Sequence, residues 1–451
     1  MSGWARQTRR WRIRVVGLGV LVCGAPALVS GQTEGSAGSA TRLDLTLLEV
    51  PASVQSLAVR PTMRQSLGIT ESTYVLGRRG IVALLPEADL GRKLAIGAFD
   101  ALTTYLPGGF GWLHEEWHRA VLSRHGANSY NGIYSFPIFQ DVVTVSRVRD
   151  EDLERLKRDH PADHVRLMSA GLESGYALLD AIGAREFFEG DLDSSGLLRW
   201  TLVLNSFVYV ASASVPDFVE ELTEKRYDEE GADVSARDFT GHDVTAWVRD
   251  LHRPDEPYAA RGVHPSGVGV DRYVVRADLT SRERDYLLTQ GRLSLLNLLD
   301  PTLFGIDAFR WGAATQYTFA FRHLLAPFGY SLGTRIMIRS GNHDLRVSGV
   351  AYRNSQNWYP GLDVEYGSSL PGLGSHVSLT PRLAMWIQPE GQRFRTERGV
   401  VGGLVAVTVR PSGNGTNPFV ELLAKSRGWV PGEMSLEASV DVRLGLRIVL
   451  R

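Results

Sequence analysis

The spacing of hydrophobic residues differs between two parts of this chain of 451 residues. From about residue 43 to residue 299, apolar residues recur mainly at helical spacing, as at Leu94, Phe99 and Leu102 before the helix-breaking Pro107. After Phe309 the period becomes two, because apolar and polar residues alternate. The pattern predicts an α+β protein with a mainly helical domain over 43–305 and an antiparallel β domain over 306–451.

The last segment shows the alternation most clearly. Apolar residues occupy every second position from Leu436 to Leu450, and mostly polar or charged residues lie between them. So long a run at period two is typical of a strand and not of a helix. About eight such segments follow residue 309, separated by turns such as Ser340-Gly341-Asn342 and Pro389-Glu390-Gly391.

Strand length and aromatic ends give this part of the chain a resemblance to outer-membrane β-barrels. Several segments exceed the roughly 9–11 residues that such a strand needs to cross a membrane, and Trp311, Trp358 and Trp429 lie near segment ends. The resemblance implies a closed antiparallel barrel of about eight strands with its apolar face in lipid. Such barrels usually finish on an aromatic residue, whereas this chain finishes Leu450-Arg451. A soluble barrel or sandwich with a buried apolar face is the alternative.

The first 31 residues have the organisation of a secretory signal peptide. Arginines within 6–14 precede an apolar run over 15–29, and Ser30 and Gly31 follow. We expect cleavage before Gln32, a flexible leader over 32–42 and an exported protein of the periplasm or outer membrane. A retained anchor is the alternative, although the run is shorter than the ~20 residues that a span needs. The only cysteine, Cys23, lies in this segment, so we expect no thiolate ligand in the mature chain.

Composition narrows the possible functions. The formal net charge of -1 argues against a nucleic-acid-binding protein, which usually carries a basic surplus. A hydrophobic fraction of 43% is that of a folded chain. The stretch from Glu220 to Gly269 is polar and rich in turn residues, and it is predicted to be a surface excursion or linker.

One short motif carries chemistry. Residues 114–118 read His114-Glu115-Glu116-Trp117-His118 and match the pattern H-E-x-x-H. They fall inside a predicted helix over 110–124, where positions i and i+4 share a face, so both imidazoles can reach one metal ion. Glu115 then lies beside the ion's open position, where it can accept a proton from activated water.

The motif resembles that of the zincin superfamily of zinc metallopeptidases. The resemblance covers this motif and its helix, and it implies zinc held by His114 and His118 with Glu115 as general base. Glu116 and Arg119 depart from the uncharged residues usual at these positions. The alternative is a helix whose His and Glu side chains make ordinary hydrogen bonds and ion pairs.

A catalytic zinc needs a third protein ligand. The metzincin arrangement is excluded, because Val121 and Arg124 stand where its glycine and histidine would be. The gluzincin arrangement takes a glutamate from a later helix, and Glu173, flanked by small residues, is the best match. Asp180 on the same predicted helix is the reserve.

Other histidines are not expected to bind the ion. His125 lies roughly 10 Å beyond His118 along the helix axis. His160 and His164 have the right spacing, but Pro161 places His160 before the start of its helix.

Two hypotheses follow. The first is an exported zinc metallopeptidase-like protein that hydrolyses peptide bonds of a peptide or protein substrate and is anchored at the outer membrane by its β domain. The second is a non-enzymatic outer-membrane β-barrel protein whose helical domain is structural.

Overall fold

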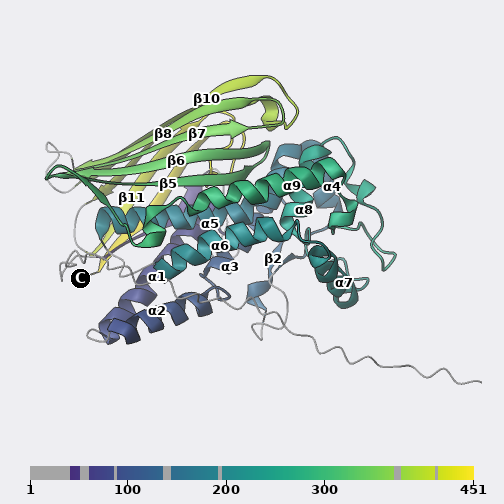
Figure 1. The fold of residues 1–451 in the computed structure, drawn as a ribbon, viewed down its shortest axis with the longest axis horizontal. Helices are drawn as coiled ribbons and strands as arrows, with labels where there is room; N and C mark the ends of the chain where they lie inside the picture. Colours follow the sequence, from purple (N-terminus) through teal and green to yellow (C-terminus); the bar gives the residue numbers. More distant parts are fainter. Residues whose placement is uncertain are drawn as a thin grey trace, which may run out of the picture. The chain divides into compact units, whose positions relative to one another are not determined.

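A computed structural model describes residues 41–50, 60–85, 89–135, 144–190, 196–369, 377–411 and 415–450. All of them belong to one compact unit that runs from Gly35 to Arg451. The predicted signal peptide, and the predicted leader up to residue 40, lie outside the described residues. Within the described ranges the fold is α+β, as the hydrophobic pattern predicts (Figure 1).

All the described α-helices precede the strands that follow residue 309. The α-helices are α1 (Met63–Leu84), α2 (Asp89–Thr103), α3 (Phe110–Arg124), α4 (Asp150–Asp159), α5 (Pro161–Glu189), α6 (Gly196–Ser212), α7 (Phe218–Glu230), α8 (Asp243–His252) and α9 (Ser281–Leu293). Two of the short 3-10 helices, η4 (Ser294–Leu298) and η5 (Pro301–Phe304), lead from α9 into the sheet.

The strands form a large sheet and a small ribbon. The ribbon pairs β2 (Tyr130–Asn131) with β3 (Val145–Ser146). The large sheet contains β1 (Thr41–Val50), β4 (Phe309–Trp311), β5 (Thr315–Ala326), β6 (Gly329–Ser340), β7 (His343–Arg353), β8 (Trp358–Ser369), β9 (Val377–Pro389), β10 (Gly399–Pro411), β11 (Gly415–Lys425) and β12 (Ser439–Leu450).

The large sheet is antiparallel and open. Its strand order is β1-β12-β11-β10-β9-β8-β7-β6-β5-β4, and the described residues include no pairing between the edge strands β1 and β4. The prediction of a closed barrel made from 306–451 is therefore wrong. The sheet recruits β1 from the start of the chain, and it ends at β4, which is only 3 residues long.

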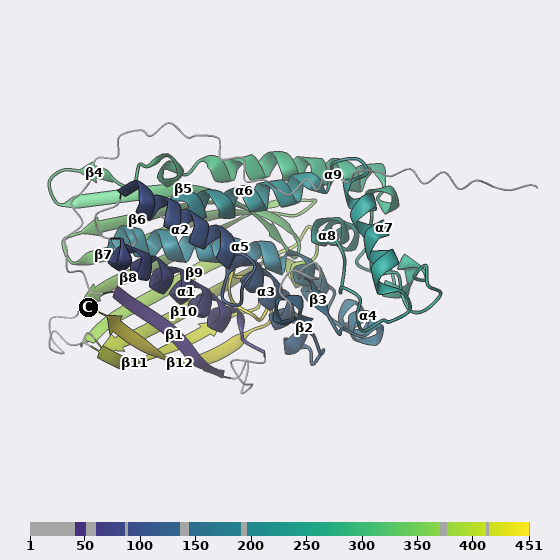
Figure 2. The same ribbon diagram turned by 90° about the horizontal axis from the view of Figure 1, so that it is seen from below.

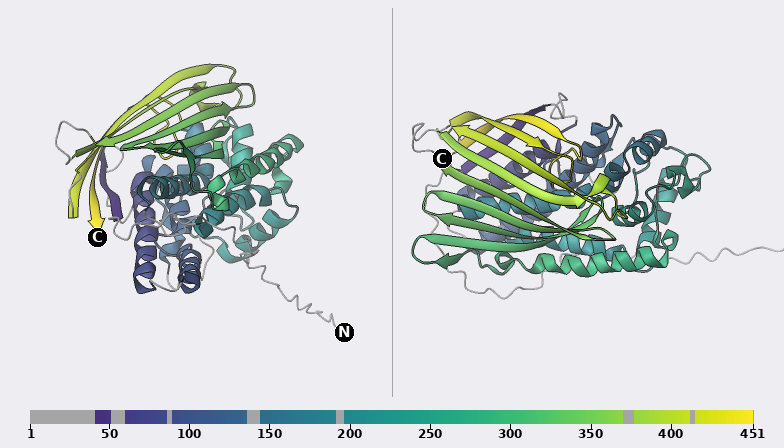
Figure 3. Two further views of the ribbon diagram at one scale, coloured as in Figure 1. Left: turned by 60° about the vertical axis from the view of Figure 1, so that its left-hand side comes forward. Right: turned by 90° about the horizontal axis from the view of Figure 1, so that it is seen from above.

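Register sorts the sheet residues onto two faces, because directly opposed residues point the same way. One row, Leu383, Val405, Ala424 and Val440, crosses four strands on the face turned away from the helices, which we call the outer face. A second row, Thr408, Glu421, Arg443 and Glu49, crosses the opposite, inner face. The sheet arches over the helices with this inner face toward them (Figure 3).

Helix α5 forms the centre of the helical layer. It begins with Pro161 at its first turn and ends at Gly190, which adopts the left-handed conformation. It packs against α1, α3, α4, α6 and α8 and against β5 and β6 of the sheet. Ser169, Gly171, Ser174 and Gly175 are buried along it, and such small residues let neighbouring helices approach closely.

Three helices occupy the open side of the sheet. Helix α1 packs on β1, α2 on α1, α6 on α2, and η5 contacts both α6 and β5. Seen from below, α6, α2 and α1 fill the space between β4 and β1 (Figure 2). No helix in the described ranges combines the length and apolar composition that a membrane span requires.

The prediction of a surface excursion or linker over 220–269 is wrong for the buried helix within it, although other parts of the segment are exposed. This segment includes most of α7 and all of α8, and every residue of α8 is buried. Apolar side chains of α8, namely Val244, Ala246, Trp247, Val248 and Leu251, belong to the main hydrophobic core.

Arg443 tests how much the buried ion pairs stabilise the fold. Its guanidinium contacts Glu49, Glu421 and Glu433, and the side chains of Arg443 and Glu433 are only 3% and 2% exposed. We expect Arg443→Met to lower the free energy of unfolding by about 3–5 kcal/mol, because it leaves buried carboxylates without their partner. Denaturant titration measures this change. The control is Arg427→Met, whose exposed pair with Glu437 should contribute less than about 1 kcal/mol. Equal losses in the two variants would contradict the argument.

Candidate metal centre

Helix α3 presents the two histidines of the motif on one face. It spans Phe110–Arg124, the range expected from the sequence, so His114 and His118 lie one turn apart. Their ring centroids are 4.9 Å apart. The side chain of His118 is 1% exposed and that of His114 is 12% exposed, so the pair is largely buried.

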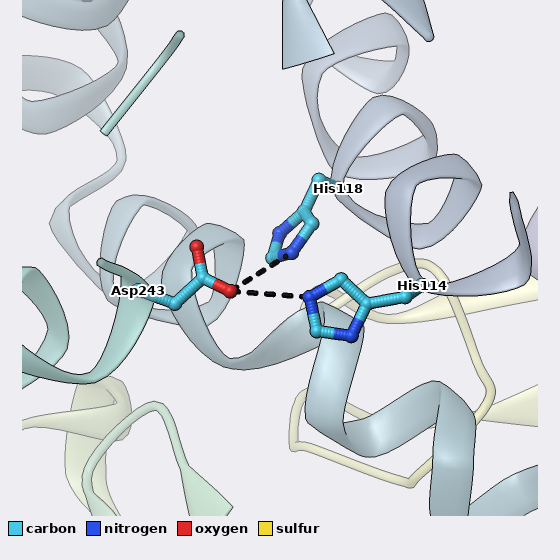
Figure 4. Close-up of side chains that lie close together, drawn as sticks. All are labelled: His114, His118 and Asp243. Carbon is cyan, nitrogen blue, oxygen red and sulfur yellow. Dashed lines mark hydrogen bonds and ion pairs between the residues drawn. The ribbon is translucent and has the colours of Figure 1, made fainter. Parts of the chain in front are cut away.

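Asp243 meets the two histidines from another helix. Its Oδ2 atom lies 3.2 Å from Nε2 of His114 and 3.3 Å from Nε2 of His118 (Figure 4). Asp243 is the first residue of α8, where the helix dipole favours a carboxylate. Gly241 turns the chain into this helix with φ +77, and a Cβ there would lie 2.7 Å from the Tyr273 ring.

These three side chains could hold a metal ion. Their ligating atoms all lie within 4.8 Å of one another. Two ligands at about 2.0–2.1 Å from zinc in tetrahedral geometry are roughly 3.3 Å apart, close to the two distances from Asp243. Within the described part of the chain, the buried Nε2 atom of His118 makes no hydrogen bond of good geometry, although Oδ2 of Asp243 lies 3.3 Å away. A buried nitrogen without a good hydrogen bond is free to bind a metal ion.

Neighbouring groups fix the orientation of the ligands. Nδ1 of His118 lies 2.6 Å from the backbone oxygen of Leu167. A carbonyl only accepts, so Nδ1 carries a hydrogen and Nε2 is the nitrogen available to a metal. The phenol of Tyr209 donates to Oδ2 of Asp243 at 3.1 Å, and its ring stacks on His242.

The backbone of α5 closes one side of the site. A Cβ built on Gly171 would lie 2.3 Å from Nε2 of His114, so the imidazole has room only because residue 171 has no side chain. The two points where α5 touches the centre, Leu167 and Gly171, are one helical turn apart.

Charges in the site are strongly coupled. Burial works against ionisation of Asp243, but the charge of His118 and the hydrogen bond from His114 lower the pKa of this carboxyl below its ordinary value. Burial likewise opposes the charged form of His118, yet Asp243 and Glu115 raise the pKa of its imidazole to about 9. In the ion-free protein, a protonated His118 therefore balances Asp243, and a bound cation would take over that charge.

The two glutamates of the motif have different surroundings. Glu115 is partly exposed, and the charged groups that influence it are those of the site, His118, Asp238 and Asp243. Burial, reinforced by the two aspartates, raises the pKa of Glu115 well above its ordinary value. Glu116 is fully buried and points elsewhere, because its Oε1 atom accepts from Arg119, Asn131 and Tyr134.

Glu173, the predicted third ligand, does not contact the two histidines. Asp243 contacts them instead. Both oxygens of Glu173 are occupied elsewhere: Oε1 accepts from Arg166 and from the backbone nitrogen of Gly432, each at 2.8 Å, and Oε2 accepts from Trp429 at 3.1 Å. The reserve residue, Asp180, pairs with Arg322 and Arg335 on the sheet.

The remaining histidines lie outside the group, as the sequence suggests. His125 contacts Asp163 at 3.4 Å, and its ring lies 4.5 Å from that of His160. His164 is fully buried and contacts Asp250 at 3.2 Å.

Sequence reasoning missed Asp243 because it assigned 220–269 to a linker. A signal was present: Gly241-His242-Asp243 precedes apolar residues at helical spacing, which is a helix start with an acidic first turn. Tyr209 and Gly171 had no such signal, because their roles depend on contacts across the fold.

Comparison with known proteins gives no further guide to this site, because no family model, no curated protein and no solved structure matches the chain.

The first prediction from this geometry concerns Gly171. We expect Gly171→Ala to displace His114 and to weaken binding of added zinc by at least about 10-fold, the lower end of what losing an orienting contact costs. Titration calorimetry on the metal-stripped full chain measures this. The matched control is Gly80→Ala in α1, where a new Cβ meets nothing within 4 Å. If Gly171→Ala bound zinc with wild-type affinity, zinc binding would not depend on the observed position of His114.

The second prediction separates the two candidates for the third ligand. Asp243→Asn removes the anionic ligand and should weaken zinc binding by at least about 100-fold, beyond the usual effect of a residue that only orients a ligand. Glu173→Gln should leave the zinc content unchanged and should lower stability, because it unpairs the buried Arg166. Elemental analysis and thermal unfolding of both variants measure this. Loss of zinc from Glu173→Gln with retention in Asp243→Asn would reverse the assignment.

Proposed function

We propose that this protein is an exported zinc-dependent hydrolase that cleaves peptide bonds. The observation that carries the proposal is the convergence of Nε2 of His114, Nε2 of His118 and Oδ2 of Asp243 at one point. Two imidazoles and one carboxylate are ligands that zinc binds in catalytic sites.

The number of ligands favours a catalytic ion over a structural one. Structural zinc is usually held by four protein side chains, whereas catalytic zinc keeps one position for water or substrate. Within the described ranges, only three His, Asp, Glu or Cys side chains form this group. A zinc ion held there would supply Lewis acidity and lower the pKa of water beside it.

Glu115 is the group that would move protons. It follows a ligand directly in the chain, it is partly exposed, and its charge couples to His118 and Asp243. Its carboxylate would accept a proton from the attacking water and deliver it to the amine that leaves when the peptide bond breaks. Glu116 cannot take this part, because three donors in the core occupy its Oε1 atom.

Other residues would hold the side chains of the site in their orientations. Tyr209 holds Oδ2 of Asp243 by a hydrogen bond, and Leu167 holds His118. Asp238 is itself fixed by Arg226, which donates to it at 2.6 Å, and by the backbone nitrogen of Phe239. Phe239 packs its ring against His118 with centroids 4.9 Å apart, which excludes water from that side.

The motif's resemblance to the zincin superfamily supports peptide hydrolysis as the reaction. Two histidines and a carboxylate also suit iron(II), so elemental analysis of the purified protein is part of the test. An iron-loaded protein would contradict the zinc assignment. The competing hypothesis, a membrane protein without enzymatic activity, predicts no turnover with any metal.

The test of catalysis is Glu115→Gln. This change preserves size and should leave zinc content and thermal stability near those of the wild type, because Glu115 is not a ligand. We expect cleavage of an unfolded protein substrate to fall by about 100-fold or more, the usual contribution of a general base. Glu151→Gln, an exposed position at the start of α4, is the matched control and should retain full activity. Equal cleavage rates for wild type and Glu115→Gln would remove the catalytic assignment.

A further inference from the structure

From β8 to β12, the outer face of the large sheet is an uncharged apolar surface, whereas β7 carries His343 and Arg353 on this face at its two ends. The side chains in register across β8–β12 include Val364, Leu383, Val405, Ala424 and Val440, and a second row includes Leu362 and Met385. Val405 is 61% exposed and Val440 is 70% exposed. Contiguous exposed apolar surface of this extent on a folded chain marks a binding surface.

The inner face has the opposite character. A cavity of about 570 Å³ lies between it and the helices, lined by charged side chains that include Arg64, Arg346, Glu365, Arg443 and Arg447. Arg382 of β9 pairs with Asp363 of β8, and Arg447 of β12 pairs with Asp44 of β1. In most soluble proteins the helix-covered face of a sheet is the apolar one. Here the polarity is reversed, as in sheets whose outer face lies in lipid.

The helices on the open side of the sheet continue the apolar surface. In α2, Leu94, Ala98, Ala101 and Leu102 share one exposed helical face, and Leu94 is 65% exposed. In α6, Leu197, Leu204 and Val208 are exposed at similar spacing, and α1 adds Leu76 and Leu84. Several charged residues of these helices form buried pairs, such as Arg78 with Asp100 and Arg199 with Glu186, whereas Lys93 of α2 is exposed.

We propose that these surfaces form one continuous belt in contact with the hydrocarbon of a lipid bilayer. The belt consists of the outer face of β6–β12 and the exposed faces of α1, α2 and α6, which close the side that the strands leave open. The contacts β1–α1, α1–α2, α2–α6 and α6–η5–β5 make the ring continuous (Figure 2). The inference uses no residue of the metal centre and does not depend on catalysis.

Two features of the belt select lipid over other occupants. The first is charge: within the described ranges, the outer-face positions of β8–β12 that face one another in register carry no ionisable side chain, whereas the inner face is rich in them. An uncharged surface complements hydrocarbon. A surface that binds a protein partner usually has a polar rim, which stays in contact with water. The second is length. Strands β8–β12 have 11–13 residues, enough to cross a bilayer at the usual tilt, which takes about 9–11 residues.

The belt would set the position of the metal centre. Helices α3, α7 and α8 lie at one end of the sheet, beyond the region where α1 and α2 fill its open side (Figure 2). With the belt in lipid, the centre would lie at one boundary between membrane and water.

The experiment measures lipid contact residue by residue. Single nitroxide labels are placed on cysteines in the full Cys23→Ser chain, reconstituted in phosphatidylcholine vesicles: Val405→Cys for the sheet, Leu94→Cys and Leu204→Cys for the helices. Val263→Cys is the matched control, because Val263 is 69% exposed but lies in the loop after α8, outside the belt. We expect labels at 405, 94 and 204 to be relaxed by oxygen and shielded from a water-soluble nickel chelate, and the label at 263 to show the reverse.

Each other result overturns the proposal. Nickel access at 94 and 204 with shielding at 405 would show that the sheet alone contacts lipid and that the helices do not complete the belt. Nickel access at all four positions would show an aqueous surface. Shielding from both reagents, together with a dimer mass, would show that a second copy covers the face. Independently, Val405→Arg and Leu94→Arg should each reduce recovery in vesicles by about 10-fold or more, and Val263→Arg should not.

Discussion

The structure depends on pairing charges between the inner face of the sheet and the helices. Arg443 binds three carboxylates, Arg335 meets Asp180 on α5, and Arg166 is neutralised by Glu173. Buried charges are costly unless they are paired, so these contacts fix how the helices sit against the strands. They also leave the apolar side chains of the strands on the outside, which is the reverse of ordinary packing of helices on a sheet.

The candidate metal centre formed by His114, His118 and Asp243 is built on the same framework. Glu173 holds the loop around Gly432 and Trp429 against α5, and α5 in turn supplies the two points that position the histidines, Leu167 and Gly171. Glu173, the predicted third ligand, therefore stabilises the packing of α5. It lies two residues along this helix from Gly171, the glycine against which His114 packs. A glutamate close to a metal site can therefore have a purely structural role, because the direction of its side chain determines whether it reaches the ion.

A short edge strand and the packing of three helices account for the open sheet. The edge strand β4 is too short to pair with another full strand, and α1, α2 and α6 fill the space between β4 and β1 (Figure 2). An exposed sheet edge invites pairing with another chain, and covering it with helices removes that liability. The N-terminal strand β1 extends the other edge by pairing with β12 from Thr41 to Val50.

The sequence by itself determined the α+β class, helix α3 with both histidines on one face, and the strands after residue 309. These are local properties, because hydrophobic period and side-chain spacing follow from the geometry of a single element. The tertiary structure decided what depends on distant residues: that Asp243 and not Glu173 reaches the histidines, that α8 within 220–269 is buried, and that helices fill the open side of the sheet. Which of two carboxylates meets a histidine more than fifty residues away depends on how several elements pack together, and a linear pattern does not contain that information.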